Sequence, residues 1–115
     1  MPERILLHDL FGERQDFDAF AWEPFRPGVE IARVYGDGQS GPAAALLRYA
    51  PGARVPAHDH LDYEHIIVLR GAQRDEHGRS EAGSCLIHAA GTSHAVVSEE
   101  GCVVLAIWNT PIRFR

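Results

Sequence analysis

Turn-forming residues divide this chain into segments too short for long helices. Gly, Pro and Asp recur between the apolar runs, and Pro24 and Pro27 limit the one helical signal, at Asp16–Ala21, to a single turn. The remaining runs have strand-like composition: Ile5–Leu10, Glu30–Tyr35, Ala44–Tyr49, Glu64–Leu69, Ser84–His88, His94–Ser98, Val103–Trp108 and Ile112–Arg115. Short strands joined by turns, without crossover helices, favour an all-β sandwich or barrel.

The composition is that of an ordinary globular protein. The 115 residues are 45% hydrophobic and 23% charged, which favours one domain. The net charge is -5 and no basic cluster occurs, so we expect neither nucleic-acid nor membrane binding. The sequence begins without a signal-peptide pattern, and its two cysteines, Cys85 and Cys102, form no CxxC pair. We therefore expect a cytoplasmic protein with reduced thiols.

One strand and the N-terminal region predict additional packing. Val103–Trp108 is apolar at both alternating sets of positions, so both of its faces should be covered, one by the barrel interior and the other by a second sheet or a second subunit. The N-terminal region is also more apolar than the outside of a barrel requires. We expect part of this surface to form a homodimer interface.

A cluster of potential metal ligands lies between two glycines. His58, His60 and Glu64 follow the pattern H-x-H-x-x-x-E between Gly52 and Gly71. On a strand, side chains two residues apart share a face, so both histidines can point inward, and a return strand can bring Glu64 beside them. His94 follows a later turn and can enter the barrel opposite these residues. Three imidazoles and a carboxylate suit one divalent ion, such as iron, manganese, nickel, copper or zinc.

An isolated H-x-H pair does not by itself require a metal, since it can be a surface feature or a pair of satisfied core histidines. The additional carboxylate and third imidazole favour the metal, because such a buried cluster has few other ways to be satisfied. Alternation places His65 on the opposite face from Glu64. Neighbouring side chains are candidates for a substrate pocket, with Arg48 divided between anchoring an anion and reaching the surface, and Tyr63 more suited to the barrel rim. The candidate pocket residues are Arg48, Tyr63, Ile66, Val68 and Val96.

Both segments resemble the two motifs of the cupin superfamily. The first fits G-x5-H-x-H-x3-E-x6-G at every defined position, from Gly52 to Gly71. The second, G-x5-P-x-G-x2-H-x3-N, is met by Gly83, Gly91 and His94, with Ala89 in place of the proline and Ser98 in place of the asparagine. Neither replaced position is a metal ligand in the family. The resemblance implies a conical antiparallel β-barrel of the jelly-roll type that holds one divalent metal at His58, His60, Glu64 and His94, often as a dimer. In the family the position of His88 is not a ligand.

Further residues resemble the ChrR-like cupins: the segment 47–52, the loop 75–78, Gly101-Cys102 and the end at Trp108–Pro111. This group includes the C-terminal domains of anti-sigma factors and small stand-alone proteins similar to β-dicarbonyl-cleaving dioxygenases. An anti-sigma factor also carries a helical sigma-binding domain, and residues 1–42 show no helical periodicity or Cys/His spacing. We therefore expect a stand-alone cupin barrel at 43–115, with residues 1–42 as a strand and loop extension that packs on the barrel or on a dimer partner.

Three functions remain open. The first is a metalloenzyme, such as a non-haem Fe(II) dioxygenase, whose substrate is a chelating diketone, enol or diol. The second is a non-catalytic sensor of a metal or small ligand. The third is a barrel with a purely structural metal, which a site with open coordination positions disfavours. The pattern favours the enzyme, although a fold alone does not fix a function.

Overall fold

The computed structural model describes residues 3–115, which form ten β-strands and one short 3-10 turn. The turn, η1, covers Phe17–Ala19, inside the expected helical segment, and Asp16 caps it by accepting a hydrogen bond from the backbone N–H of Asp18. The strands are β1 (Glu23–Arg26), β2 (Val29–Tyr35), β3 (Ala43–Tyr49), β4 (Ala53–Asp59), β5 (Glu64–Asp75), β6 (Gly78–Glu81), β7 (Cys85–His88), β8 (Ser93–Ser98), β9 (Cys102–Trp108) and β10 (Arg113–Phe114). All of their pairings are antiparallel.

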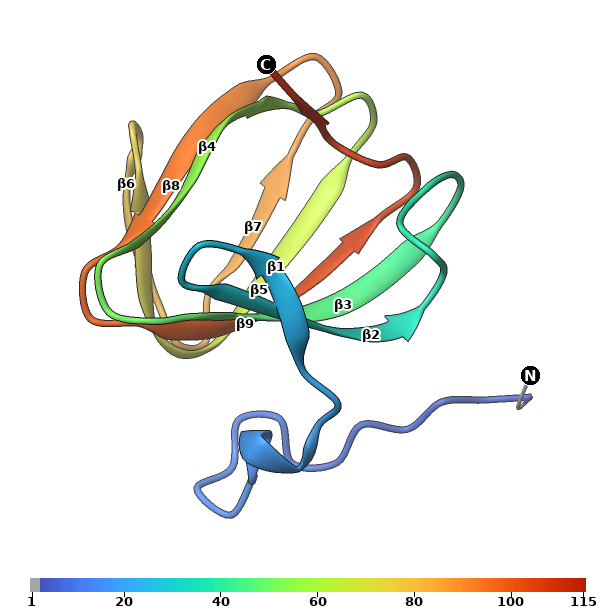
Figure 1. Cartoon of the computed structure of the whole chain (residues 1–115), viewed down its shortest axis with the longest axis vertical. Coiled ribbons are helices and arrows are strands. Elements are labelled where there is room, and N and C mark those ends of the chain that lie inside the picture. The colour runs from blue at the N-terminus through green and yellow to red at the C-terminus, as the bar shows by residue number, and fades with distance from the viewer. Residues whose placement is uncertain (1–2) are drawn as a thin grey trace.

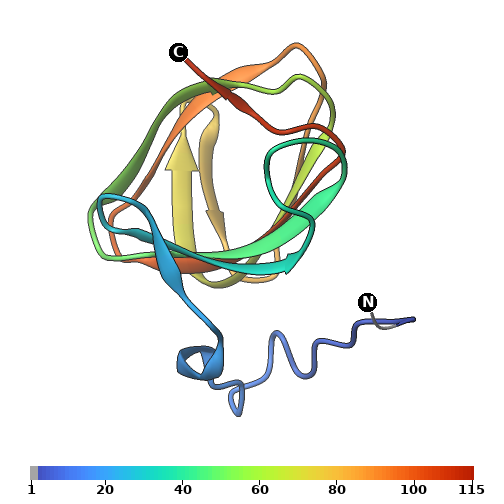
Figure 2. The ribbon, with the colours of Figure 1, turned by 45° about the vertical axis from the view of Figure 1, so that its right-hand side comes forward.

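The strands curl into a barrel because β5 belongs to two sheets (Figures 1 and 2). Its first half pairs with β9 and β7, in a sheet that continues through β3, β2 and β1. Its second half pairs with β6 and β8, beside β4 and β10. Gly71 lies where β5 passes from one sheet to the other, with a φ of 69°. An added Cβ would lie 2.1 Å from the carbonyl oxygen of Gly101, so only glycine fits this crossing.

Apolar side chains cover both faces of the sheet that contains β9. Cys102, Val104 and Ala106 belong to the cluster inside the barrel, whereas Val103 and Leu105 belong to a second cluster outside it. The outer cluster is completed by Phe17, with Leu10, Phe20 and Trp22 packed against it. In Figure 1 the N-terminal segment lies along the outside of the barrel, below β2, β3 and β9. The second face is thus covered by the N-terminal segment of this chain, where the sequence suggested a second sheet or subunit.

The strand predictions were right for most of the barrel and wrong at the N-terminus. Ile5–Leu10 is not a strand, because no neighbouring strand pairs with its backbone. The expected strands omitted β1 and β6 and ended β5 too early, at Leu69. The strand expected at the H-x-H pair, for which no bounds were given, is β4, which ends at Asp59. β1 and β2 lie before residue 43 but are hydrogen-bonded into the same sheet as β3. The barrel sheet therefore begins at residue 23, within the region assigned to the extension.

Several large apolar side chains remain on the surface of the described residues, among them Ile5, Leu6, Phe11 and Ile87. They are compatible with the expected homodimer, which stays a prediction. None of the helical segments in residues 3–115 has the length and apolar character needed to cross a membrane.

Candidate metal centre

Four buried side chains converge at one end of the barrel interior. His58 lies on β4, His60 follows that strand, Glu64 begins β5 and His94 lies on β8. Each offers a nitrogen or oxygen atom, and these atoms all lie within 4.8 Å of one another. His58 and His94 are direct partners across β4 and β8. The predicted set is therefore brought together, and it forms a cluster that can hold a metal ion.

A local irregularity in β4 makes this convergence possible. The pairing of β4 with β8 shifts between Val55 and His58, at Pro56, which has no N–H to donate to a neighbouring strand. Because an extra residue at a bulge changes the alternation, Val55 and His58 both face the interior although they are three residues apart. His60 then follows His58 on the inner side. The bulge thus joins the apolar wall of the barrel to the histidine cluster on one strand.

Hydrogen bonds fix the tautomers of His58 and His60. Nδ1 of His58 lies 2.9 Å from the carbonyl oxygen of Pro56, which can only accept, so Nδ1 carries the proton. Nδ1 of His60 lies 3.0 Å from the hydroxyl oxygen of Thr92. That hydroxyl donates its own proton to the carbonyl of Ala89 at 2.6 Å, so it accepts from His60. Both rings therefore present Nε2 with a lone pair, the form in which imidazole binds a metal.

Asp75 fixes His94 in the same way. Its Oδ2 lies 2.9 Å from Nδ1 of His94, and both side chains are almost fully enclosed. Burial acts to raise the pKa of Asp75, but the hydrogen bonds from His94 and from the backbone N–H of His77 outweigh it and hold the pKa below its ordinary value. The ionised carboxylate accepts from Nδ1–H, and Nε2 of His94 is left as a lone pair. Burial also lowers the pKa of His58, although its hydrogen bond to Pro56 opposes this effect, so His58 stays neutral at neutral pH.

The arrangement of acceptors around Glu64 calls for a positive charge. Nε2 of His60 is buried, has no hydrogen-bond partner within residues 3–115 and lies 3.3 Å from Oε1 of Glu64. With its proton held on Nδ1, this nitrogen has only a lone pair to offer toward the carboxylate. A cation between the two atoms would satisfy both, together with Nε2 of the other two histidines. The chemistry of the donor set therefore fits a divalent transition metal.

Two further side chains border Glu64 on the neighbouring strands. His88 of β7 and Trp108 of β9 are its cross-strand partners, and their buried Nε2 and Nε1 atoms have no hydrogen-bond partner in the described residues. The His88 ring stacks on His60, with centroids 4.7 Å apart, and burial followed by the neighbouring His94 and His60 lowers its pKa to about 4. His88 is thus a neutral side chain that packs against the cluster and is not one of its four donors.

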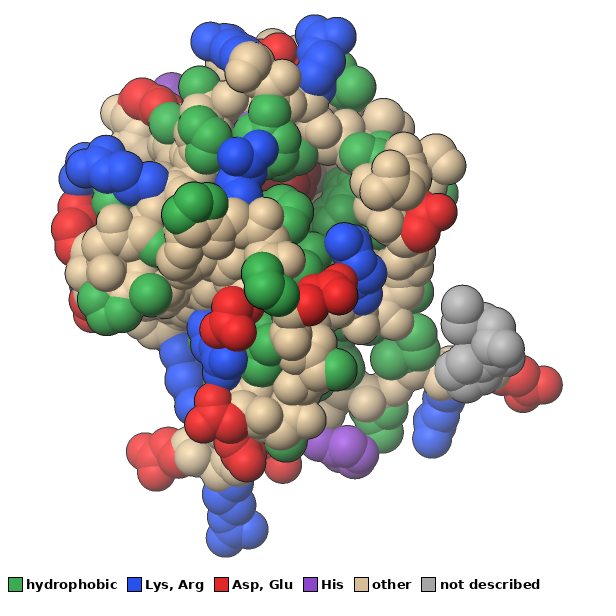
Figure 3. Space-filling model, viewed as in Figure 1, with side chains coloured by type: hydrophobic (Ala, Val, Ile, Leu, Met, Phe, Trp, Pro, Cys, Tyr) green, Lys and Arg blue, Asp and Glu red, His purple; other side chains and the backbone are tan. Residues whose placement is uncertain are grey.

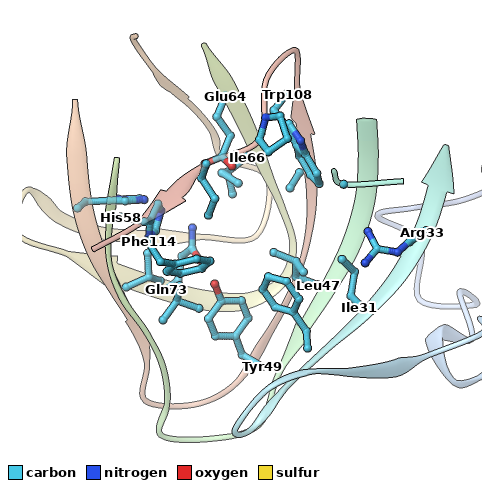
Figure 4. Close-up of a pocket in the computed structure, with 18 of the residues that line it drawn as sticks. Ile31, Arg33, Leu47, Tyr49, His58, Glu64, Ile66, Gln73, Trp108 and Phe114 are labelled. Atoms are coloured by element: carbon cyan, nitrogen blue, oxygen red, sulfur yellow. The ribbon is translucent and has the colours of Figure 1, made fainter. Parts of the chain in front are cut away.

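An apolar cavity of about 300 Å³ leads to the cluster. His58, Glu64 and His94 line it, and most of the remaining wall consists of aliphatic and aromatic side chains from several strands and the C-terminal segment. Figure 3 shows a hollow lined mainly by hydrophobic side chains on this face, and Figure 4 shows the lining residues. A small molecule in this cavity would therefore reach the cluster in a largely dry environment.

The candidate pocket residues divide into two groups. Ile66 and Val96 line the cavity, and Val68 is fully buried in the same interior cluster without lining it. Tyr63 is half exposed in the turn between β4 and β5 and does not line the cavity.

Arg48 does not line the pocket, because strand alternation places it on the outer face of β3. There it pairs with Glu30 and Asp18 and lies over the ring of Trp22. Its role in the structure is to attach the N-terminal segment to the sheet.

Three interior polar residues, Tyr49, Gln73 and Asp75, were not predicted from the sequence. Tyr49 follows the inward-facing Leu47 by two positions, so alternation along β3 was enough to find it. Gln73 and Asp75 were hidden by a second irregularity, between Val68 and Arg70 of β5. Before this shift the even-numbered residues of β5 face the interior, and after it the odd-numbered residues do. A prediction that assumes constant alternation along the strand therefore places Gln73 and Asp75 on the wrong face.

Comparison with known proteins agrees with this fold. The family model described as ChrR Cupin-like domain matches residues 12–110. The chain is 36% identical over 112 residues to the anti-sigma-E factor ChrR of Cereibacter sphaeroides, covering 95% of this chain and 50% of that protein. The crystal structure of Rhodobacter sphaeroides SigE in complex with the anti-sigma ChrR matches with a TM-score of 0.74 and 31% identity, over 83% of this chain and 52% of the matched chain. The chain thus spans about half the length of these relatives.

A more distant solved structure shares the fold over nearly the whole chain. The acetylacetone dioxygenase from Acinetobacter johnsonii matches with a TM-score of 0.76, over 99% of this chain and 78% of that one. Its identity is 13%, so the likeness concerns the fold alone.

Proposed function

Because this chain belongs to the family of ChrR cupin-like domains, we propose that it binds one divalent transition-metal ion through His58, His60, Glu64 and His94. The observation that carries the proposal is the convergence of three Nε2 lone pairs and a buried carboxylate at the end of an apolar cavity. Fe(II) is our first choice of ion, and Zn, Mn, Ni or Cu suit the same donors.

We further propose that the cavity binds a small chelating molecule, such as a diketone, an enol or a diol, for oxidative cleavage. A bound ion with open coordination positions would supply Lewis acidity toward the oxygens of such a molecule and redox chemistry with dioxygen. The residues of the chain would orient the molecule and exclude water: Ile66 and Val96 form part of the dry wall beside the donors. The dioxygenase likeness supports only the suitability of this fold for such a reaction.

A non-catalytic sensor is the second candidate. The observation that favours it is the 36% identity to an anti-sigma factor, far above the 13% identity to the dioxygenase. In this case occupation of the cavity would alter a protein partner's binding, with no turnover of the ligand. The donor cluster and the cavity suit both functions. The enzyme and the sensor therefore differ only in whether the bound ligand reacts.

Anaerobic loading with Fe(II), followed by oxygen uptake with a panel of diketones and catechols, tests both candidates. We expect about one ion per chain in the wild type, loss of the ion in His60→Ala, and retention in the control His77→Ala, whose residue lies in an exposed turn. Oxygen consumption that depends on one of the compounds supports the enzyme. Tight metal binding without consumption supports the sensor, and full metal occupancy in His60→Ala would contradict the proposed centre.

A further inference from the structure

Two polar side chains of the cavity wall are buried, and no side-chain hydrogen bond to another of the described residues satisfies them. Tyr49 at the end of β3 and Gln73 in the second half of β5 are each only 6% exposed, and both line the cavity. Neither the hydroxyl nor the amide takes part in a side-chain hydrogen bond of the described residues, and neither is among the fully enclosed orphan atoms. Figure 4 shows the Tyr49 hydroxyl pointing into the cavity and Gln73 entering it from a different strand.

These two groups impose a condition on any molecule that fills the cavity. A buried polar group that loses its hydrogen bonds to water and gains none in return costs free energy. The apolar side chains of the wall offer no hydrogen bonds to Tyr49 and Gln73, so these must come from water or from the ligand. A purely hydrocarbon ligand would displace water from Tyr49 and Gln73 and leave both unpaired. A ligand that carries a hydrogen-bonding group would replace that water, and sites built in this way discriminate strongly between the two.

The charges at this part of the wall specify a neutral group. Burial, and after it the neighbouring Cys102 and Glu64, raise the pKa of Tyr49, so its hydroxyl stays protonated, and the Gln73 amide carries no charge. Among the described residues that line the cavity, Arg33 is the one Lys or Arg, and it is paired with Glu23 at 3.4 Å. A carboxylate or phosphate beside Tyr49 and Gln73 would therefore be buried without a free Lys or Arg side chain beside it.

We propose that the ligand of this cavity is bifunctional: a small, mainly apolar molecule that chelates the metal through oxygen atoms at one end and carries a neutral hydroxyl or carbonyl group bound by Tyr49 and Gln73. This inference rests on the proposed function, since the chelating end requires the metal. Leu47, Ile66, Val96 and Phe114 supply the apolar wall for the rest of the molecule. Tyr49 and Gln73 are, in this arrangement, the residues that determine specificity.

The test uses two matched series of catechols as probes and zinc as a redox-silent metal. One series carries unbranched alkyl tails at ring position 4, and the other carries tails of the same length that end in a hydroxyl. Binding of each probe to the zinc-loaded protein is measured by calorimetry. At the tail length that reaches Tyr49 and Gln73, we expect the hydroxyl probe to bind about 5–10-fold more tightly than its alkyl counterpart.

The variants Tyr49→Phe and Gln73→Leu should each reduce this preference, and the double variant should abolish it, with alkyl-probe and zinc affinities unchanged. Tyr35→Phe, at a partly exposed tyrosine outside the cavity wall, is the matched control and should keep the full preference. Equal binding of the two series at every length, or a preference that survives in the double variant, overturns this inference alone. Zinc binding without any catechol binding overturns the proposed chelating ligand as well and leaves only the metal centre. A protein that binds no zinc overturns the proposed function together with it.

Discussion

At the scale of single residues, the site depends on which nitrogen of each histidine holds the proton. The three partners that fix the protons come from different parts of the chain: the Pro56 carbonyl, the Thr92 hydroxyl and the Asp75 carboxylate. Such partners orient a ring and raise its affinity for a metal. The orientation of the three rings is therefore set by residues outside the group of four donors.

Asp75 should accordingly be needed for metal binding although it is not one of the four donors. We expect Asp75→Ala to weaken zinc binding by about 10–100-fold, because His94 loses the acceptor that fixes its tautomer. Competition with a chromophoric chelator measures the affinity. Asp59→Ala is the matched control: Asp59 lies between two of the donors in sequence but pairs with Arg115 and Arg113 on the outside. Equal losses in the two variants would contradict this role of Asp75.

The lowered pKa values of His58 and His88 predict a pH-dependent stability of the metal-free protein. Between the ordinary histidine pKa of about 6.5 and the lowered values, the unfolded chain binds more protons than the folded chain. The free energy of unfolding should therefore fall as the pH drops from neutral to about 5. Urea unfolding in the presence of a chelator measures it. In His88→Gln the free energy of unfolding should fall less between neutral pH and about pH 5. An unchanged fall would argue against a His88 side chain that is neutral in the folded protein.

At the scale of elements, two irregular strands and one crossing position the site. The shift in β4 turns the histidines inward, and the shift in β5 turns Gln73 and Asp75 inward. Gly71 lets β5 leave one sheet and enter the other. Gly52 and Gly71, the two glycines of the first motif, should therefore differ in how well they tolerate a side chain, although both have a positive φ.

Gly71→Ala should destabilise the protein by about 3 kcal/mol or more, because the new Cβ would meet the Gly101 carbonyl at 2.1 Å in addition to the backbone strain. Gly52→Ala should cost only about 1–2 kcal/mol, since its φ is 85° but no atom lies within 4 Å of the added Cβ. Denaturant unfolding of the two variants checks the difference. Similar losses would mean that β5 does not cross the Gly101 backbone closely.

At the scale of the whole molecule, the N-terminal segment closes the outer face of the sheet. Phe17 is buried against the outer cluster, Arg70 lies over its ring, and Arg70 also donates to the carbonyl of Gln15 at 2.6 Å. Arg48 holds the same segment through Asp18 and Trp22. The cavity lies on the other side of this sheet, so the cover contributes to stability without contacting the donor cluster.

Phe17→Ala should therefore lower the free energy of unfolding by about 3–5 kcal/mol without changing the zinc affinity of the folded protein. Phe11→Ala, at a residue that is 60% exposed, should change it by no more than about 0.5 kcal/mol. Thermal unfolding and a zinc titration on the same samples measure both quantities. A loss of zinc affinity in Phe17→Ala would show that the outer cover also shapes the interior.

The sequence by itself determined the all-β class, because short runs between turns are a local property, and its two motifs indicated His58, His60, Glu64 and His94 as one group. It was wrong about a strand at Ile5–Leu10 and left Arg48 between two faces, since pairing and burial depend on segments far away in the chain. Only the tertiary structure decided which nitrogens stay free and which polar groups enter the cavity. Both depend on contacts of shifted strands with residues far away in the sequence, such as Thr92, Asp75 and Tyr49. A local sequence pattern cannot predict such contacts.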